Sequence, residues 1–403
     1  TGSSVKIGSA LTTNYFGGGI AQVQIYNRAL TAAEVAKNYN ATVSEFANRT
    51  DPFVEVTNEG YTPPVTGGGD LYPFTSAYFT VSQALTDDTT SQEHRFGPSQ
   101  SQVRGWLSGT ANGGGGHTWA DTYVDCPQDG YQRWQIPKTG KYTITAKGGG
   151  AGQCQQGYIG RGVKVIADFN LTKGDYLILA AGQGVPDDLN SDSCNGGGGA
   201  TWVMSGSNYL TAVPLIVANG AGGDSSDGTT KDQPNIVLGS SFTVTPTAAQ
   251  GGGPAVTGKQ TIPILSNVYS SLAFGEGDND TTQPNSAGWL TDGEDVPGQT
   301  PGIGGHCFRT DLIGGTRSDS SAGYGGFGGG SGGQDEEGNA GGGFTGAHGN
   351  DNNDKTGHGS TFVNDNNQGN VSVQLAQATT TYQNSDYTSE DQYQGWIKIE
   401  FVS

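Results

Sequence analysis

The stretch that decides the fold reads Tyr131-Gln-Arg-Trp-Gln-Ile-Pro-Lys-Thr-Gly-Lys-Tyr-Thr-Ile-Thr-Ala-Lys-Gly-Gly-Gly-Ala-Gly152. It holds two runs, 131–136 and 141–146, that are rich in aromatic and β-branched residues and have the length of β-strands. A short turn, Lys138-Thr-Gly140, separates the two runs, and a glycine tract follows the second. Such turns, with another at Lys173-Gly174, predict antiparallel meanders in which successive strands pair.

The same alternation of strand-like runs and glycine tracts continues on both sides of this stretch. Glycine supplies 70 of the 403 residues, against a usual share of about 7%, and it gathers in clusters between the runs. The predicted fold class is therefore all-β, with an antiparallel sandwich. Further strands are predicted at 162–169, 175–181, 200–204, 214–218, 362–363, 371–375 and 396–402.

The densest glycine tract is Gly323-Tyr-Gly-Gly-Phe-Gly-Gly-Gly-Ser-Gly-Gly333, in which Tyr324 and Phe327 stand three residues apart. Three residues per turn is the period of an extended threefold helix without internal hydrogen bonds. Because ordering glycine costs more entropy than ordering any other residue, an ordered tract needs many contacts to offset that cost. The tracts predict a packed bundle of polyglycine helices, and flexible linkers are the alternative.

Residues 1–45 differ from the rest of the chain. Strands are predicted at 5–9 and 19–26, and a capping box at Thr31–Glu34 predicts a short helix that continues to Tyr39. The segment resembles the C-terminal end of a laminin-G-like, concanavalin-A-like jelly roll, a resemblance carried by Gly19, Ile20, Val23, Ile25, Tyr26, Asn27, Arg28, Ala29, Leu30 and Glu34. Two strands and a helical turn cannot bury a sandwich face, so the missing strands are expected upstream or in another chain.

The remainder, about residues 70–403, resembles the glycine-rich domain of anaplastic-lymphoma-kinase-type receptor ectodomains and of bacterial and phage surface proteins. The resemblance lies in the order of the segments 131–152, 162–169, 171–183, 195–204 and 214–223. It implies a jelly-roll sandwich resembling tumour-necrosis-factor folds, joined to a bundle of polyglycine-II helices, and a rigid binding platform without catalytic residues. The predicted organisation is a jelly-roll fragment at 1–45, a linker at 46–72 and a glycine-rich domain at 73–403. The glycine-rich domain contains an insertion at about 224–322.

Charge is scarce and negative: 14% of the residues are charged, and the formal net charge is −19. This balance excludes nucleic acid as a partner, because a phosphate backbone requires a surface of Lys and Arg. The acidity suits divalent cations or simple solubility. No apolar run reaches the 18 or so residues of a membrane span. Since the first residue is Thr, the chain is expected to begin inside a longer product.

Four cysteines are present, Cys126, Cys154, Cys194 and Cys307, and no two have the spacing of a zinc site. We expect a disulfide between Cys154 and Cys194, because both lie in Gly- or Asn-rich loops that follow strand-like runs. A disulfide would place the protein in an oxidising compartment. Free thiols are the alternative, and they would suit a virion protein assembled in cytosol.

Acidic loops offer one candidate metal site. Glu276, Asp278 and Asp280 lie within one short loop of the predicted insertion. Oxygen ligands close together on a loop are what Ca²⁺ requires, although this run lacks the ligand spacing of an EF-hand. Calcium is therefore the cofactor considered, and a solvated acidic loop is the alternative.

Aromatic residues that flank glycine loops are candidates for stacking on sugar rings: Trp106, Trp119, Trp289, Tyr324 and Phe327. The alternative is that they pack inside the sandwich or against glycine helices. The five histidines are dispersed, and the nearest phosphate-loop candidate, Val256–Gln260, lacks the Ser or Thr of that motif. We therefore expect the chain not to be an enzyme.

The predicted function is that of a non-enzymatic surface adhesin or fibre protein, such as a phage tail fibre or a bacterial surface protein, at the cell exterior or the virion surface. Its partner would be a cell-surface receptor or glycan, contacted by loops in 224–322 and 334–358. The alternatives are a subunit of an extracellular filament or sheath, which would self-associate, and a receptor ectodomain fragment. Electron microscopy separates the filament alternative, because such a subunit forms a repeating polymer.

Overall fold

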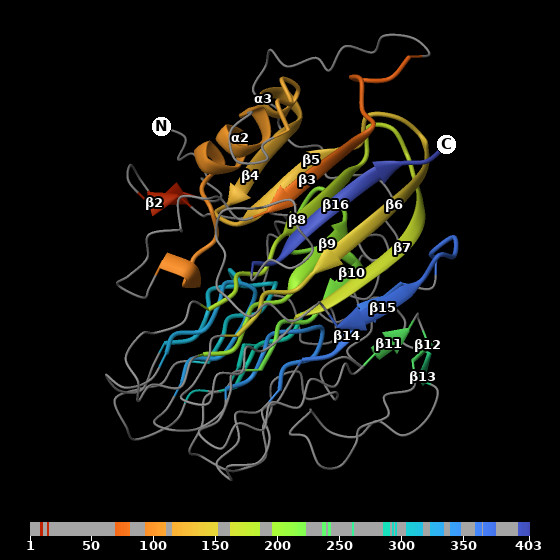
Figure 1. Cartoon of the computed structure of the whole chain (residues 1–403). Coiled ribbons are helices and arrows are strands. Elements are labelled where there is room, and N and C mark those ends of the chain that lie inside the picture. Colours follow the sequence, from red (N-terminus) through yellow and green to blue (C-terminus); the bar gives the residue numbers. More distant parts are fainter. Residues whose placement is uncertain are drawn as a thin grey trace, which may run out of the picture. The chain divides into compact units, whose positions relative to one another are not determined.

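The structure, a computed structural model, divides the chain into two units, residues 1–68 and 69–403 (Figure 1). In the first unit it describes β1 (Ser9–Ala10), which pairs antiparallel with β2 (Asn14–Tyr15). The strand predicted at 19–26, the helix after it and residues 5–8 of the first predicted strand lie outside the described residues. In the second unit the described residues are 69–80, 93–109, 115–151, 162–185, 196–222, 236–238, 241–242, 260–261, 285–290, 292–293, 295, 304–316, 323–333, 339–347, 359–364, 366–375 and 394–403.

A five-stranded antiparallel sheet forms one layer of the second unit, in the order β15-β7-β6-β16-β3. Its first and last strands in sequence lie side by side, with Phe79 opposite Ile397. The two ends of the unit are therefore held together within one sheet. The strands are β3 (Ser76–Thr80), β6 (Gly140–Lys147), β7 (Val163–Leu171), β15 (Ser372–Leu375) and β16 (Trp396–Phe401).

A seven-stranded sheet forms the second layer, in the order β11-β14-β10-β9-β8-β5-β4. Its strands pair antiparallel except for β11 and β14, which are parallel. The strands are β4 (Val124–Gln128), β5 (Tyr131–Gln135), β8 (Tyr176–Ala180), β9 (Thr201–Ser205), β10 (Val213–Ala218), β11 (Ile236–Leu238) and β14 (Thr361–Val363). A separate pair joins β12 (Ser241–Phe242) to β13 (Gln260–Thr261).

The predicted all-β, antiparallel sandwich is confirmed. Successive strands pair in β6–β7 and in β8–β9–β10, as the meander prediction expected, but not across the two turns on which that prediction rested. The turn at Lys138-Thr-Gly140 leads from β5 in the seven-stranded sheet to β6 in the five-stranded sheet. The turn at Lys173-Gly174 returns the chain from β7 to β8 in the same way. At both turns the chain passes from one sheet to the other. A connection between sheets uses the same turn residues as a hairpin within one sheet, so the sequence pattern does not distinguish the two kinds of connection.

The main core lies between the two sheets and follows the two-residue period of the strands. Ile144 and Val165 point inward from the five-stranded sheet, while Trp134, Leu179 and Val203 do so from the seven-stranded sheet, and all five are buried. Alternate side chains on a strand face opposite sides of its sheet. The residues next to these along each strand therefore point to the outer faces of the two sheets.

The outer face of the seven-stranded sheet is buried as well. Ile178, Trp202 and Val217 point to this side from β8, β9 and β10, and each is fully buried in a second core. Residues that come much later in the chain, including Trp289 and Phe308, complete that core. Part of the predicted insertion therefore packs onto the sheet, and the apolar runs of β8 to β10 are explained by burial on both faces.

Glycine tracts form a layer next to this second core, and in Figure 1 they run side by side away from the sheets. We call the described segments 148–151, 182–185, 196–200, 219–222, 285–290, 292–293, 304–316, 323–333 and 339–347 the glycine layer. The tract 196–200 lies inside it: a β-carbon on Gly199 would overlap the carbonyl oxygen of Phe327, and one on Gly197 would overlap that of Ala340. Backbones approach this closely only where side chains are absent.

The densest tract turns back on itself. Gly328 and Gly329 have φ values of +109° and +83°, which disfavour residues with a β-carbon. Beyond this turn the Gly333 amide donates to the Gly323 carbonyl over 2.7 Å. The tract thus forms two adjacent arms.

A helical segment that the sequence pattern did not reveal packs against the edges of the sandwich. It contains η2 (Glu93–Arg95), α2 (Gln100–Ser108) and α3 (Ala120–Tyr123). A capping box between Ser99 and Gln102 begins α2, and Val103 and Leu107 bury its apolar side in the main core. The helix also supplies hydrogen-bond partners to the backbone of the edge strand β4. Gln100 accepts from the Cys126 amide, and Arg104 donates to the Val124 carbonyl.

Arg104→Ala should lower the free energy of unfolding by about 1 kcal/mol, because it leaves the Val124 carbonyl without its donor at a partly buried edge. Urea unfolding followed by tryptophan fluorescence measures the change. Ser108→Ala is the matched control, since it removes an exposed hydrogen bond on the same helix and should change stability by less than about 0.5 kcal/mol. Equal effects of the two variants would contradict the role of Arg104.

Candidate functional site

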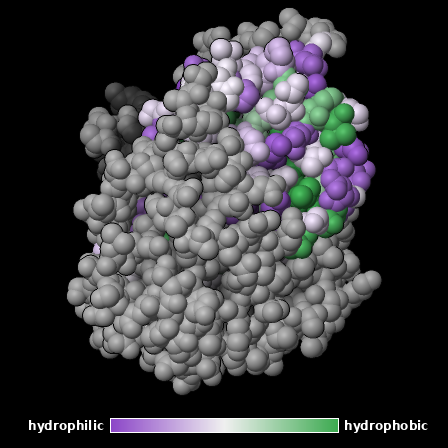
Figure 2. Space-filling view, viewed as in Figure 1, coloured by the Kyte–Doolittle hydropathy of each residue, from purple (hydrophilic) through white to green (hydrophobic). Residues whose placement is uncertain are grey.

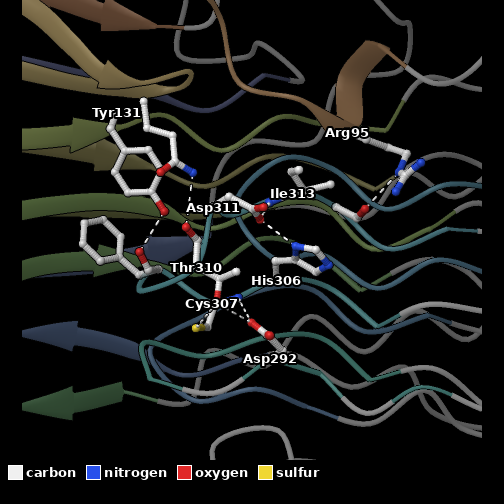
Figure 3. Close-up of polar contacts among 11 residues, drawn as sticks. Arg95, Tyr131, Asp292, His306, Cys307, Thr310, Asp311 and Ile313 are labelled. Atoms are coloured by element: carbon white, nitrogen blue, oxygen red, sulfur yellow. Dashed lines mark hydrogen bonds and ion pairs between the residues drawn. The ribbon is translucent and has the colours of Figure 1, made fainter. Parts of the chain in front are cut away.

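Residues 304–316 of the glycine layer, which we call the junction loop, attach that layer to the sandwich (Figure 3). The Tyr131 hydroxyl donates to the carbonyl of Phe308 over 2.7 Å, and the Phe308 side chain is fully buried in the second core. The side-chain amide of Gln128 donates to the carbonyl of Thr310. Both donors come from the β4–β5 hairpin, so one hairpin holds the middle of the loop.

Arg309 attaches the junction loop to a second hairpin, the one between β9 and β10. Its guanidinium donates to the carbonyls of Tyr209 over 2.9 Å and Ala212 over 3.2 Å. The guanidinium also lies over the ring of Trp289, 5.1 Å from the ring centroid, a cation–π geometry. The contacts of the Arg309 guanidinium therefore hold the junction loop against the sandwich.

Asp292 fixes the first turn of the junction loop. Its Oδ1 accepts from the Cys307 amide over 2.7 Å and from the Thr310 hydroxyl over 3.0 Å. The Cys307 thiol lies 3.3 Å from that hydroxyl, and burial raises the pKa of Cys307 to about 11. A thiol with this pKa stays protonated at neutral pH and is a poor nucleophile or metal ligand.

His306 and Asp311 close the other turn of the loop, with 2.6 Å between His306 Nδ1 and Asp311 Oδ1. The hydrogen bond that His306 donates to the Asp311 carboxylate raises the pKa of His306 above its ordinary value and outweighs burial. Burial opposes ionisation of Asp311, but hydrogen bonds from His306 and the Ile313 amide lower its pKa. The pair has the arrangement of an imidazole and its orienting carboxylate, and its hydrogen bonds fix the turn that runs from His306 to Ile313.

The His306–Asp311 pair predicts a pH dependence of stability. The raised pKa of His306 gives stabilisation that is complete below about pH 6.5 and disappears as pH rises through the folded-state pKa. The lowered pKa of Asp311 gives stabilisation that is present above about pH 4 and disappears on acidification. Thermal unfolding from pH 4 to 9 should show a higher Tm at pH 5 than at pH 8. His306→Gln should flatten this slope, and an unchanged slope would contradict the assignment.

The start of the helical segment holds the other side of the junction loop. The Gly314 amide donates to the carbonyl of Arg95, and the Arg95 Nε donates back to the Gly314 carbonyl over 2.9 Å. One residue earlier, the carbonyl of His94 accepts from the Phe327 amide. Sequence reasoning missed Arg95 and Gly314, because they lie 219 positions apart and belong to no motif.

Four of the five aromatic residues predicted to stack on sugars are buried. Trp106, Trp289, Tyr324 and Phe327 have exposed fractions of 8%, 2%, 7% and 0%. Phe327 shows the reason: its ring packs against the backbone of Gly97 and Gly130, where missing side chains leave room for an aromatic ring. Their prediction as sugar-stacking residues is therefore corrected to core packing.

Trp119, the fifth predicted residue, is partly exposed at the edge of the sandwich. It stacks with Tyr72 at a centroid distance of 4.9 Å and with His117 at 4.8 Å. Burial lowers the pKa of His117, which favours the neutral ring at neutral pH. Trp119 therefore remains a candidate for stacking on a sugar, through the part of its ring that Tyr72 and His117 do not cover.

The other predicted sites fall outside the described residues. This applies to the calcium candidates Glu276, Asp278 and Asp280 and to the disulfide candidates Cys154 and Cys194, all of which stay predictions. Among the residues that the structure describes, no group of three or more His, Cys, Asp or Glu side chains could hold a metal ion. Cys126 and Cys307 are free thiols.

The outer face of the five-stranded sheet is polar in character. Figure 2 shows hydrophilic residues interspersed with apolar ones over the area where β6, β7 and β16 lie in Figure 1. Two ion pairs lie on this face, Lys141 with Asp168 over 3.1 Å and Lys398 with Glu400 over 2.8 Å. Within the described segments, the structure has no helix with the length and apolar character to cross a membrane.

Comparison with known proteins gives one partial similarity. No protein-family model matches the chain. Over 112 residues the chain is 30% identical to the leukocyte tyrosine kinase receptor of Mus musculus. The match covers 27% of this chain and 11% of the receptor, so the chain spans only a small part of that protein's length. The similarity agrees with the receptor part of the resemblance seen in the sequence and leaves its phage, bacterial and laminin-G-like parts as predictions.

Proposed function

We propose that this chain is a non-enzymatic surface adhesin or fibre module that binds a cell-surface receptor or glycan, outside the cell or on a virion. The observation that carries the proposal is the glycine layer, which is fastened to a sheet that is buried on both faces. Hydrogen bonds between distant segments make such a layer stiff, and a stiff scaffold presents its connecting loops at low entropic cost on binding.

The hydrogen-bond pattern supports polyglycine helices within this layer. The amides of Gly197, Gly198 and Gly199 donate to carbonyls on three different segments, those of Ser331, Ala221 and Gln183. Their carbonyls accept from amides on further chain positions, those of Gly326, Gly342 and Gly149. A helix with three residues per turn points successive groups about 120° apart, which suits a tract surrounded by neighbours. This arrangement favours packed helices over flexible linkers.

Several glycine tracts end in pairs that hydrogen bonds join. Gly323 and Gly333 are joined by a hydrogen bond, the Ser331 amide donates to the Ala340 carbonyl, and the Val185 amide donates to the Gly150 carbonyl. The chain segments that follow these ends include parts of the predicted contact regions 224–322 and 334–358. The scaffold is therefore suited to present several loops to one partner.

Replacing residues 334–338, the segment between the described ends Gly333 and Asn339, with a Gly-Ser segment of equal length tests the proposal. Labelled protein is incubated with a panel of bacterial and mammalian cells, and bound fluorescence is measured. We expect the replacement to change which cells are bound or to weaken binding at least tenfold. Replacing the turn residues Thr172 and Lys173 with Ser is the matched control, and binding that responds equally to both changes, or to neither, counts against the proposal.

A receptor ectodomain module is the second candidate, because the partial match is to a receptor tyrosine kinase. Such a module would bind a soluble protein ligand and would not depend on cell-surface glycans. Treating the cells with glycosidases separates the two functions: an adhesin for glycans loses its binding, whereas a receptor module is unaffected.

A further inference from the structure

Arg95 is held in place at the junction loop by three contacts. Its Nε donates to the Gly314 carbonyl over 2.9 Å (Figure 3). Its guanidinium carbon lies 5.3 Å from the centroid of the Phe96 ring and 5.4 Å from that of Tyr324. Two aromatic rings and one hydrogen bond therefore fix the plane of this guanidinium, which reduces the entropy lost when a ligand binds it.

The two terminal amino groups of Arg95 have no hydrogen-bond or ion-pair partner in the part of the chain that the structure describes. The arginine is partly buried, and desolvation lowers its pKa from the ordinary value. The nearby Asp311 is already paired with His306. A partly desolvated cation without a counter-ion is unfavourable, so a planar anion at these amino groups would restore the lost interactions.

Phe96 places an open aromatic surface beside this cation. Its side chain is 44% exposed, whereas Phe327 and Phe308 nearby in the fold are fully buried. The backbone carbonyl of Phe96 accepts from the buried side-chain amide of Gln183 over 2.6 Å, which fixes the residue on the glycine layer. Ligand sites combine such an aromatic surface with a small number of fixed polar groups.

We propose that Arg95 and Phe96 form a binding site for a carboxylate-bearing sugar. The Arg95 fork donates two parallel hydrogen bonds to the sugar carboxylate, a geometry that matches the planar guanidinium. The apolar face of the sugar ring packs on Phe96. This inference rests on the proposed function, because it names the class of glycan that an adhesin of this kind would recognise.

Calorimetric titration of the full chain with 3′-sialyllactose, and with neutral lactose as the reference, tests the site. Sialyllactose should bind at least tenfold more tightly than lactose, and added salt should reduce the difference. Arg95→Gln should remove the preference, Arg95→Lys should restore only part of it because lysine lacks the fork, and Phe96→Ala should weaken binding severalfold. Lys173→Gln, a cation removed elsewhere, is the matched control and should leave binding unchanged.

Equal binding of the two sugars, absence of sialyllactose binding, or a preference that survives Arg95→Gln overturns the inference. Cell binding by the same protein is measured in parallel. Cell binding that persists without sialyllactose binding leaves the proposed function standing and rejects only this site. If Arg95→Gln does not fold, as judged from thermal unfolding, Arg95→Lys and Phe96→Ala decide the outcome.

Discussion

Gly199→Ala should lower the free energy of unfolding of the second unit by at least about 3 kcal/mol, the upper end of the cost of overpacking. The added β-carbon would overlap the Phe327 carbonyl oxygen, and that atom belongs to backbone that is hydrogen-bonded to Gln183. Neither group can rotate away as a flexible side chain would. Urea unfolding followed by tryptophan fluorescence gives the change in free energy.

Gly105→Ala is the control for this experiment. Gly105 lies within α2, and a β-carbon there would meet nothing within 4 Å. Alanine in a helix interior is more favourable than glycine by roughly 1 kcal/mol, so this variant should be slightly more stable than the original chain. A tolerated Gly199→Ala would show that the glycine tracts do not pack as closely as the structure places them.

Phe327→Ala should cost about 3–5 kcal/mol, the range for removing a fully buried phenylalanine. Its ring fills the space above Gly97 and Gly130 and connects the glycine layer to the start of β5. The loss should appear as a lower midpoint in urea and as a glycine layer that becomes sensitive to protease before the sandwich does.

Phe96→Ala provides the matched comparison, because this phenylalanine is 44% exposed. It should change stability by less than about 0.5 kcal/mol while weakening sugar binding. Comparison of the two variants therefore distinguishes the role of Phe327 in packing from the role of Phe96 in sugar binding. A Phe327→Ala variant of unchanged stability that loses sugar binding would reverse these roles.

The strands that sequence patterns located correctly are those with strong local signals. β8 and β9 are short apolar runs next to glycine tracts. β6 contains the aromatic and β-branched run Tyr142–Thr145 and is followed by a glycine tract. β4 was missed because it contains Asp125, Cys126 and Pro127, which do not read as a strand. Its edge position and its contacts with α2 permit these residues.

The candidate site was beyond sequence reasoning for a different reason. Arg95 and Gly314 are separated by 219 positions, and Tyr131 and Phe308 by 177. No local pattern relates such residues, and each alone looks like an ordinary loop or strand residue. The aromatic candidates were chosen for their glycine neighbours, and those same neighbours bury them, since a glycine backbone offers a flat surface on which a ring can pack.

The amino-acid sequence by itself determined that the second unit is an all-β sandwich whose strands alternate with glycine tracts, because strand periodicity and glycine clustering are local properties. Only the tertiary structure decided which sheet each strand joins, that one sheet is covered on both faces, and that Phe327 is buried while Phe96 is exposed. These outcomes depend on contacts between residues far apart in the chain. Burial is a property of such contacts, so two phenylalanines of the same local character end in opposite environments.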